Sequence, residues 1–300
     1  MNYYRIFGLN IASELPLPSR AIPGPSPCGA DLVIVFGTVP EMLAAPRSNG
    51  IRYQVAPGEF LLQVDNVARF YVRDGNRITI SPEAGAGEED ILIFLMGSAM
   101  GALLHQRNTL VLHGSAIAVN GSGVAFCGPS GSGKSTLAAG FHRRGYPLLA
   151  DDLCAIAIHD GRPVVIPGFP RLKLWADTLL KLDTRTERLQ RVRLGVQLEK
   201  YFLPVDDSLQ EPVPLAAVYT LAVSNTDTMS VTPLSGANKV DQLLGNTYRK
   251  RILHGLRGGT DHFGQCSAVA AAVAVKRVIR PDRGFRLDEM LDLLATGFTP

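Results

Sequence analysis

The chain has 300 residues, of which 46% are hydrophobic and 19% are charged, and its net charge is +3. This composition indicates a globular protein with a sizeable core, in one large domain or two small ones. A charge of +3 is too small to indicate nucleic-acid binding by itself.

Targeting and redox signals favour the cytoplasm. The N-terminus, MNYYRIFGLN, has no basic segment followed by a long apolar stretch, so we expect no secretory signal. The cysteines are scattered without metal-like spacing, and we expect them to be reduced and buried. They are Cys28, Cys127, Cys154 and Cys266.

Residues 1–86 have the pattern of a small β-rich region. Strand-like runs alternate with turn signals, and Asp74-Gly75-Asn76 predicts a hairpin. No cluster of chemistry-bearing side chains occurs here. We therefore expect this region to support a second domain over residues 87–300, or to contact another subunit or the substrate. The strand-like runs are residues 31–36, 59–64, 68–72 and 77–80.

The most apolar segment, residues 91–104, predicts a buried helix. It is shorter than a membrane span, and three acids precede it, which suits the first turn of a helix. Gly97 and Gly101 form a G-x-x-x-G pair. In a membrane such a pair indicates dimerisation, and in a soluble chain it indicates close packing on a neighbour. We favour the soluble interpretation and expect no membrane association.

An Asn120-Gly121 pair predicts a tight hairpin between the apolar runs 115–119 and 124–127. The second run therefore pairs antiparallel with its predecessor. In the common parallel-sheet nucleotide-binding proteins, crossover helices separate neighbouring strands instead. The sequence thus predicts an α/β fold with a mixed sheet.

The second run leads into GPSGSGKS at residues 128–135, a full match to G-x-x-x-x-G-K-[ST], and a helical pattern follows it. The glycines let backbone N–H groups converge on phosphate oxygens, and the helix turns its positive N-terminal end to the same anion. Lys134 can reach the β- and γ-phosphates, and the Ser135 hydroxyl can ligate Mg²⁺. We therefore predict a bound nucleoside triphosphate, expected to be ATP, with Mg²⁺. The predicted contact residues are Gly128, Pro129, Ser130, Gly131, Ser132, Gly133, Lys134, Ser135 and Thr136.

Asp151 and Asp152 end the apolar strand pattern that follows the P-loop helix. Successive strand residues face opposite ways, so one carboxylate can meet Mg²⁺ or the attacking group while the other points elsewhere. At a strand end both can reach the site. A structural pair that caps a turn is the alternative.

Basic residues dominate the segment from 171 to 200. One interpretation is a solvated face, and the other is a mobile segment that closes over phosphates or holds an anionic peptide. Regular aromatic interleaving is absent, so nucleic acid is not an expected partner. The basic residues are Arg171, Lys173, Lys181, Arg185, Arg188, Arg191, Arg193 and Lys200.

The rest of the chain alternates between strand and helix patterns. Around His159-Asp160-Gly161-Arg162 we expect a hairpin, and Arg249 and Arg251 lie in a basic helical pattern. The expected elements after this hairpin are a strand at 218–223, helices at 241–256 and 267–275, a short strand at 277–279 and a terminal helix at 286–294.

Residues 113–156 resemble the catalytic domain of HPr kinase/phosphorylase. The shared order is LHGSAIAV, a hairpin, GPSGSGKS, a short helix ending in RRGYPL, and LADDLCAI. The resemblance implies a P-loop kinase domain with a nucleotide fold similar to that of phosphoenolpyruvate carboxykinase. It also implies phosphorylation of a serine hydroxyl on a small protein.

Two segments outside residues 113–156 refine the resemblance. The N-terminal residues, YRIFGLNIASELPLP onward, look like shorter HPr-kinase-related proteins, some of which phosphorylate ribosomally made peptides such as lasso peptides. The bifunctional enzymes carry an E-V-R-G-x-G signature, and the corresponding GFPRLKLW here has no matching acid. Phosphorylase activity, and HPr itself as the substrate, are therefore not predicted.

The predicted activity is ATP-dependent transfer of the γ-phosphoryl group to a serine or threonine hydroxyl of a protein or ribosomally made peptide. A small-molecule kinase and a nucleotide-binding regulatory protein with little turnover are the alternatives. The adjacent aspartates favour a kinase, since a binding module needs no base. We also expect a homo-oligomer that resides in the cytoplasm.

The resemblance implies Asp151 as the general base and Asp152, with Ser135, at the metal, whereas the residues alone leave the two aspartates interchangeable. His113 matches a family histidine; it either lies by the phosphates or bonds to the backbone. Arg171 and Lys173 are candidates for stabilising the transferred charge, and Arg249 and Arg251 are weaker ones. The predicted catalytic residues are Asp151, Lys134, His113 and Arg171.

Overall fold

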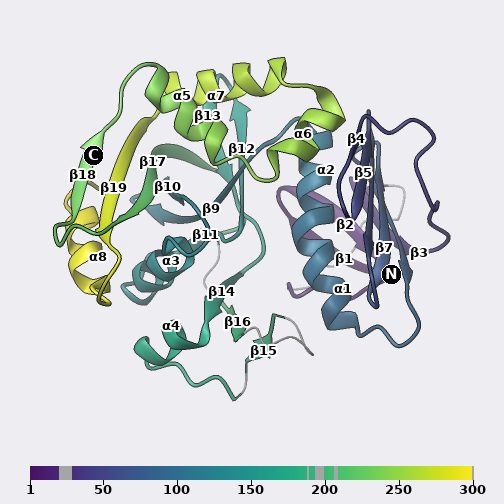
Figure 1. Cartoon of the computed structure of the whole chain (residues 1–300), viewed down its shortest axis with the longest axis horizontal. Coiled ribbons are helices and arrows are strands. Elements are labelled where there is room, and N and C mark those ends of the chain that lie inside the picture. The colour runs from purple at the N-terminus through teal and green to yellow at the C-terminus, as the bar shows by residue number, and fades with distance from the viewer. Residues whose placement is uncertain (20–28, 188, 193–198, 206–208, 299–300) are drawn as a thin grey trace.

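The computed structural model describes residues 1–19, 29–187, 189–192, 199–205 and 209–298. Cys28, Arg188 and Arg193, which figure in the predictions above, lie outside these ranges. Two sheets lie on either side of a central helical rod, with the N-terminal sheet on the right of Figure 1.

The N-terminal sheet has eight strands in the order β1-β2-β3-β8-β7-β6-β5-β4. The Asp74-Gly75 turn, with φ values of 54° and 64°, joins β7 to β8 in an antiparallel hairpin as predicted. The β-rich N-terminal region is thus confirmed. The strands are β1 (Asn2–Ile6), β2 (Leu9–Ser13), β3 (Leu32–Phe36), β4 (Ser48–Asn49), β5 (Tyr53–Ala56), β6 (Glu59–Val64), β7 (Ala68–Arg73) and β8 (Arg77–Pro82).

The apolar segment forms the central rod, made of α1 (Glu88–Phe94), a π-helical turn η2 (Leu95–Ala99) and α2 (Met100–Gln106). Its buried residues share one core with the N-terminal sheet. Gly101 lies against the ring of Tyr248, since a Cβ built on it would be 2.7 Å from Tyr248 Cε1. Gly101 therefore serves close packing inside the protein, as predicted, whereas a Cβ on Gly97 would make only an ordinary 3.6 Å contact with the Tyr248 hydroxyl. No helix in the described ranges is long and apolar enough to span a membrane.

The second sheet is mixed and carries the P-loop. The hairpin of β9 (Leu110–Val119) and β10 (Ser122–Cys127) turns at Asn120-Gly121, where both φ values are positive at 49° and 76°. On its other edge β10 pairs parallel with β17 (Val213–Ser224), which pairs parallel with β19 (Ala274–Pro281). The predicted fold class, an α/β P-loop protein with a mixed sheet and a β-rich N-terminal region, is confirmed.

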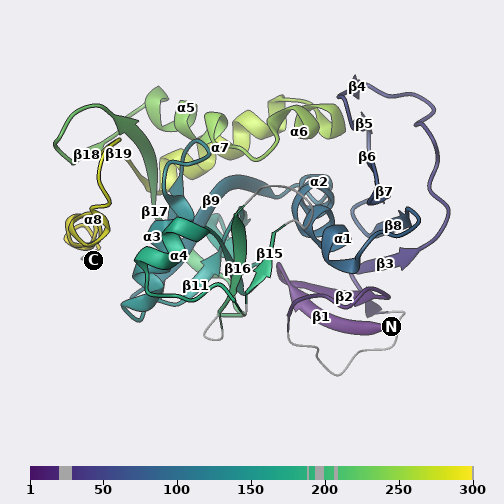
Figure 2. The same cartoon turned by 60° about the horizontal axis from the view of Figure 1, so that its bottom comes forward.

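Helices cover both faces of this sheet (Figure 2). On one face α3 (Lys134–Arg143) and α8 (Leu287–Ala295) share a core with the sheet, and on the other α5 (Ala237–Gly245) and α7 (Thr260–Ala272) share a second core with it. The sheet is completed by β11 (Leu148–Ala150), β12 (Leu153–His159), β13 (Arg162–Ile166) and β18 (Ser230–Pro233).

A small three-stranded sheet lies over the start of α3. It consists of β14 (Arg171–Trp175), β16 (Lys200–Pro204) and β15 (Gln190–Arg191) in that order, followed along the chain from β14 by α4 (Ala176–Lys181). Leu172, Leu174 and Leu179 anchor it in the core that contains α3. The opposite side chains of β14, Lys173 and Trp175, are thereby turned toward the P-loop side.

One predicted element differs from the structure. The helix predicted at 241–256 is broken after α5, and α6 (Lys250–Arg257) follows. The break arises because the Tyr248 N–H donates to Val111 O of β9 (2.8 Å), and Arg249 takes a left-handed φ of 43°. The apolar strand predicted to end at the aspartate pair is β11, and β12 begins directly after Asp152, which has a φ of 71°. The division into domains at residue 86 stays a prediction.

Replacing Gly101 by valine tests the packing of the central rod. The added side chain overlaps the buried Tyr248 ring, so we expect Gly101→Val to lower the free energy of unfolding by about 1–3 kcal/mol in urea denaturation. Gly264→Ala is the matched control, because that helical glycine has open space around it. The control should be neutral or stabilise by up to about 1 kcal/mol. Equal stability of Gly101→Val and the unsubstituted protein would contradict this packing.

Candidate active site

The P-loop connects β10 to α3, and its glycines are required by its geometry. Gly128 has a φ of 148°, and a Cβ there would be 2.7 Å from Leu221 O of β17. Gly133 has a φ of 103° and caps the N-terminus of α3. Both conformations are strained for residues with a side chain. The loop therefore passes close to β17 and delivers its amides to the start of α3.

The side chains of the loop are arranged to meet an anion. Lys134 is buried, and its Nζ donates to Gly128 O (2.8 Å) and Pro129 O (2.9 Å). Burial lowers the pKa of this ammonium. The Ser132 hydroxyl is also buried and has no hydrogen-bond partner among the described residues. A phosphate at the α3 N-terminus satisfies both groups.

Arg280, near the carboxyl end of β19, donates hydrogen bonds to two backbone carbonyls of the P-loop. Its Nε donates to Ser132 O (2.8 Å), and its Nη2 donates to Gly131 O (3.1 Å). The contact exists because β10, β17 and β19 are parallel, so their carboxyl ends meet at one edge of the sheet. The sequence predictions missed Arg280. Its position in an Arg-Pro pair just after a predicted strand is the signal that was available.

Asp151 ties the P-loop helix to the rest of the site. Its Oδ1 accepts from the hydroxyls of Ser135 (2.8 Å) and Ser115 (2.6 Å), and its Oδ2 accepts from the Lys173 N–H (2.7 Å). Burial raises the pKa of this carboxyl, and the three hydrogen bonds oppose that rise. Ser115 was not predicted. It lies two residues after His113 on β9, on the same face of the strand.

Asp152 points to a different pair of groups. Its Oδ1 is 3.2 Å from His113 Nδ1, and its Oδ2 is 3.2 Å from Lys173 Nζ. Burial opposes ionisation of Asp152, but these two partners outweigh it and hold its pKa well below the usual range. The left-handed backbone at Asp152 is what turns its carboxylate away from that of Asp151.

Two cavities meet at this cluster. The first, which we call the P-loop cavity, has a volume of about 1190 Å³ and is lined by residues 130–137 together with β14 and the segment after β19. The second, the strand-end cavity, has a volume of about 1010 Å³ and is lined by the end of β17, the α5–α6 connection and η2. Both are lined by His113, Asp152 and Lys173, whereas Asp151 lines the P-loop cavity alone.

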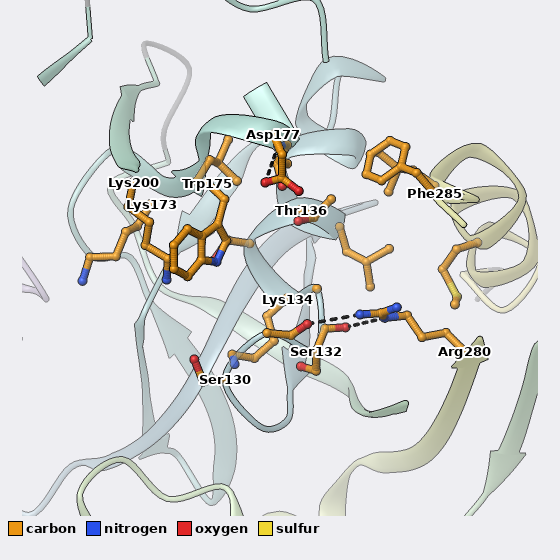
Figure 3. Close-up of a pocket in the computed structure, with 18 of the residues that line it drawn as sticks. Ser130, Ser132, Lys134, Thr136, Lys173, Trp175, Asp177, Lys200, Arg280 and Phe285 are labelled. Atoms are coloured by element: carbon orange, nitrogen blue, oxygen red, sulfur yellow. Dashed lines mark hydrogen bonds between the residues drawn. The ribbon is translucent and has the colours of Figure 1, made fainter. Parts of the chain in front are cut away.

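Figure 3 shows how the P-loop cavity is laid out. Ser130, Ser132 and Lys134 lie at one end beside Arg280, and Thr136 lies at the middle. Trp175 and Phe285 lie on opposite sides of Thr136, with Lys173 and Lys200 on the Trp175 side. The predicted nucleotide contacts from Ser130 to Thr136 all line this cavity, while Gly128 and Pro129 line the strand-end cavity.

The three arginines predicted as candidates for the site differ in whether they line a cavity. The Arg171 guanidinium stacks 3.7 Å from the Phe202 ring centroid, burial lowers its pKa to about 10, and it lines neither cavity in the described ranges. Arg249 lines the strand-end cavity, where its Nε donates to the Tyr248 hydroxyl (3.2 Å), but Arg251 does not line it. The structure thus brings together Lys134, His113 and both aspartates, and it places Arg171 two residues before Lys173 on the same face of β14, against Phe202.

The oxygen donors beside the P-loop fit a small hard cation. The Ser135 hydroxyl and the Asp151 carboxylate are 2.8 Å apart, and phosphate oxygens are the usual remaining ligands of Mg²⁺ at such sites. Within the described residues, no group of three or more His, Cys, Asp or Glu side chains is placed to hold a metal ion. The donor set therefore suits a cation that arrives with a nucleotide.

One curated protein is similar to half of the chain. No family model matches the chain. The HPr kinase/phosphorylase of Azoarcus sp. (strain BH72) is 33% identical over 157 residues, which is 49% of this chain and 49% of that protein. The matched half of the chain is thus similar to part of an HPr kinase/phosphorylase. The resemblance predicted from the motifs is thereby confirmed, and the chain spans about half the length of the curated relative that it matches.

A solved structure is also similar in part. The Hpr(Ser) kinase/phosphatase from Coxiella burnetii is 14% identical, with a TM-score of 0.31, over 62% of this chain and 91% of that chain. The likeness to phosphoenolpyruvate carboxykinase stays a prediction.

A buried histidine supports the wall of the strand-end cavity. His105 Nε2 on α2 lies 2.8 Å from the carbonyl oxygen of Tyr248, and the side chain is fully buried. Burial lowers the pKa of His105 to about 4. The neutral ring therefore holds in place the segment that presents Tyr248 and Arg249.

His105 makes the free energy of unfolding depend on pH. Between about pH 6.5 and pH 4 the unfolded chain binds a proton on His105 and the folded chain does not, so stability falls as the pH falls through this window. The loss from this one group is about 3 kcal/mol at most. His105→Gln, which keeps an N–H donor but does not titrate, should flatten the fall in urea unfolding free energy over this range. An unchanged slope would contradict the assignment.

Proposed function

We propose that the protein is an ATP-dependent phosphotransferase that moves the γ-phosphoryl group to a serine or threonine hydroxyl of a protein or peptide. The observation that carries the proposal is the cluster of His113, Asp152 and Lys173, which lines both cavities. A donor in one cavity and an acceptor in the other would meet there. The relationship to an HPr kinase/phosphorylase over half of the chain supports the same chemistry.

The donor half is the P-loop cavity. The loop amides, Lys134 and the Ser132 hydroxyl bind the phosphates, and Arg280 keeps the loop carbonyls turned away from them. Ser135 and Asp151 would hold Mg²⁺, which supplies charge neutralisation on the β- and γ-phosphate oxygens. Lys173, already paired with Asp152, lies where the transferred group must pass.

The acceptor half is the strand-end cavity, and we assign Asp152 rather than Asp151 as the base. All three hydrogen bonds of Asp151 fix it beside Ser135, on the donor side. Asp152 lines the acceptor cavity, and each of its oxygens keeps a free acceptor position beyond the one used by His113 or Lys173. In the transfer the acceptor oxygen bonds to phosphorus, the bond to the bridging oxygen of ADP breaks, and the hydroxyl proton goes to Asp152.

A low pKa does not exclude this role for Asp152. A loose phosphoryl-transfer transition state needs the hydroxyl positioned more than it needs a strong base. His113 and Lys173 hold the carboxylate in one orientation from two sides, which is what positioning requires.

The strand-end cavity supports a peptide more than a small metabolite. Polar side chains such as Gln242, Asn246 and Arg249 line it and offer hydrogen-bonding groups to a peptide backbone. A small-molecule acceptor remains the second candidate, on the observation that apolar Ile93 and Leu221 also line the cavity. A ribosomally made peptide such as a lasso peptide, a homo-oligomeric state and a cytoplasmic location stay predictions.

Separate substitution of the two aspartates tests these roles. Asp152→Asn should bind ATP with Mg²⁺ as tightly as the unsubstituted protein, while transfer to a mixture of serine- and threonine-containing peptides falls by about 10²–10⁴-fold. Asp151→Asn should weaken Mg²⁺-dependent ATP binding by about tenfold or more, because a charged ligand is lost. Calorimetry measures binding, and mass spectrometry of the peptides measures transfer.

The control is Asp160→Asn, on the exposed turn between β12 and β13, which should change neither quantity. Full transfer activity in Asp152→Asn would overturn its assignment as base. A failure of the unsubstituted protein to phosphorylate any peptide, while it phosphorylates a small hydroxyl compound, would favour the second candidate.

A further inference from the structure

We propose that Trp175 and Phe285 form the binding site for the nucleobase of the phosphoryl donor. The inference rests on the proposed function, because it takes the P-loop cavity as the donor site. It adds the chemical class of group that the far end of this cavity recognises, which is a planar aromatic heterocycle.

Both rings lie where a nucleoside must go. They line the same cavity as residues 130–137, and Figure 3 places them on opposite sides of Thr136, above Ser130, Ser132 and Lys134 in the view. A triphosphate whose phosphates lie on the loop carries its base outward past the first turn of α3. Trp175, at the end of β14, and Phe285, just before α8, lie on two sides of that path.

The two rings are more exposed than aromatic side chains that serve the core. Trp175 is 41% exposed and Phe285 is 42% exposed, whereas Phe141 of α3, in the core below, is fully buried. Large exposed aromatic side chains inside a cavity leave ring faces free for a ligand. Met229 and Met290 add apolar side chains to a lining that also holds charged residues such as Arg283 and Arg286, and thioethers suit contact with a stacked base.

A lysine lies over each ring. Lys200 Nζ is 4.3 Å from the Trp175 ring centroid, and Lys181 Nζ is 4.7 Å from the Phe285 ring centroid. Each cation occupies one face of its ring, so it restricts the orientation of the ring and leaves the opposite face for stacking. Asp177, between the two rings in Figure 3, adds a carboxylate that can accept from an exocyclic amine or a ribose hydroxyl.

The sequence makes the test direct, because Trp175 is the one tryptophan of the chain. ATP with Mg²⁺ should quench the intrinsic tryptophan fluorescence of the full-length protein by stacking on the indole. Inorganic tripolyphosphate, which has the phosphates but no base, should bind competitively with ATP and leave the fluorescence nearly unchanged. An equal change with both ligands would overturn the proposal.

Substitution gives a second, independent measurement by calorimetry. Trp175→Ala should weaken ATP binding by about 5- to 150-fold, the range for loss of one base–aromatic stack, and leave tripolyphosphate affinity unchanged. Trp175→Phe should recover most of the ATP affinity. The control is Phe263→Leu, an exposed aromatic on α7 that lines neither cavity, and it should bind both ligands normally.

The outcomes separate this inference from the proposed function. If Trp175→Ala changes the affinity for neither ATP nor tripolyphosphate, the assignment of the nucleobase site is wrong. The assignment of the phosphate site is then unaffected, because both ligands still bind. If neither ligand binds the unsubstituted protein, the donor site itself is wrong, and with it the proposed function.

Discussion

The arrangement of the site depends on the buried carboxylate of Asp151. It accepts hydrogen bonds from β9 through Ser115, from the P-loop helix through Ser135 and from β14 through the Lys173 N–H. Hydrogen bonds to a charged group contribute about 1.5–3 kcal/mol each, and an unpaired carboxylate at this depth would be strongly unfavourable. The three segments are therefore held in one geometry by a single charge.

The fixed position of Asp151 also bears on the next residue, Asp152. Asp151 directly follows β11 and is fixed on the P-loop side, and β12 continues in the same direction along β9. The change of backbone conformation is confined to the connection, where Asp152 takes a left-handed φ of 71°. That conformation sends the Asp152 carboxylate to His113 and Lys173, at the junction of the two cavities. Adjacent residues thus face different surroundings: Asp151 lines the P-loop cavity alone, whereas Asp152 lines both cavities.

Local patterns in the sequence predicted the parts of the site that are formed by neighbours in the chain. The Asn120-Gly121 hairpin, the P-loop and the aspartate pair each depend on short-range backbone geometry, and the structure contains all three. Contacts between distant segments were not predictable in this way. Arg280 contacts the loop 148 residues earlier in the chain, Ser115 reaches Asp151 across two strands, and the direction of each aspartate depends on the φ of Asp152. Arg171 lies on the same face of β14 as Lys173, two residues earlier, and its guanidinium stacks on the Phe202 ring, a contact that the sequence did not predict.

A crystal structure with Mg²⁺ and a non-hydrolysable ATP analogue would test the central claim most directly. The account predicts the triphosphate along residues 128–135, the cation at Ser135 and Asp151, and the terminal phosphoryl group facing Asp152 across the junction of the two cavities. A terminal phosphoryl group turned away from Asp152, or a cation held by Asp152 in place of Asp151, would contradict it.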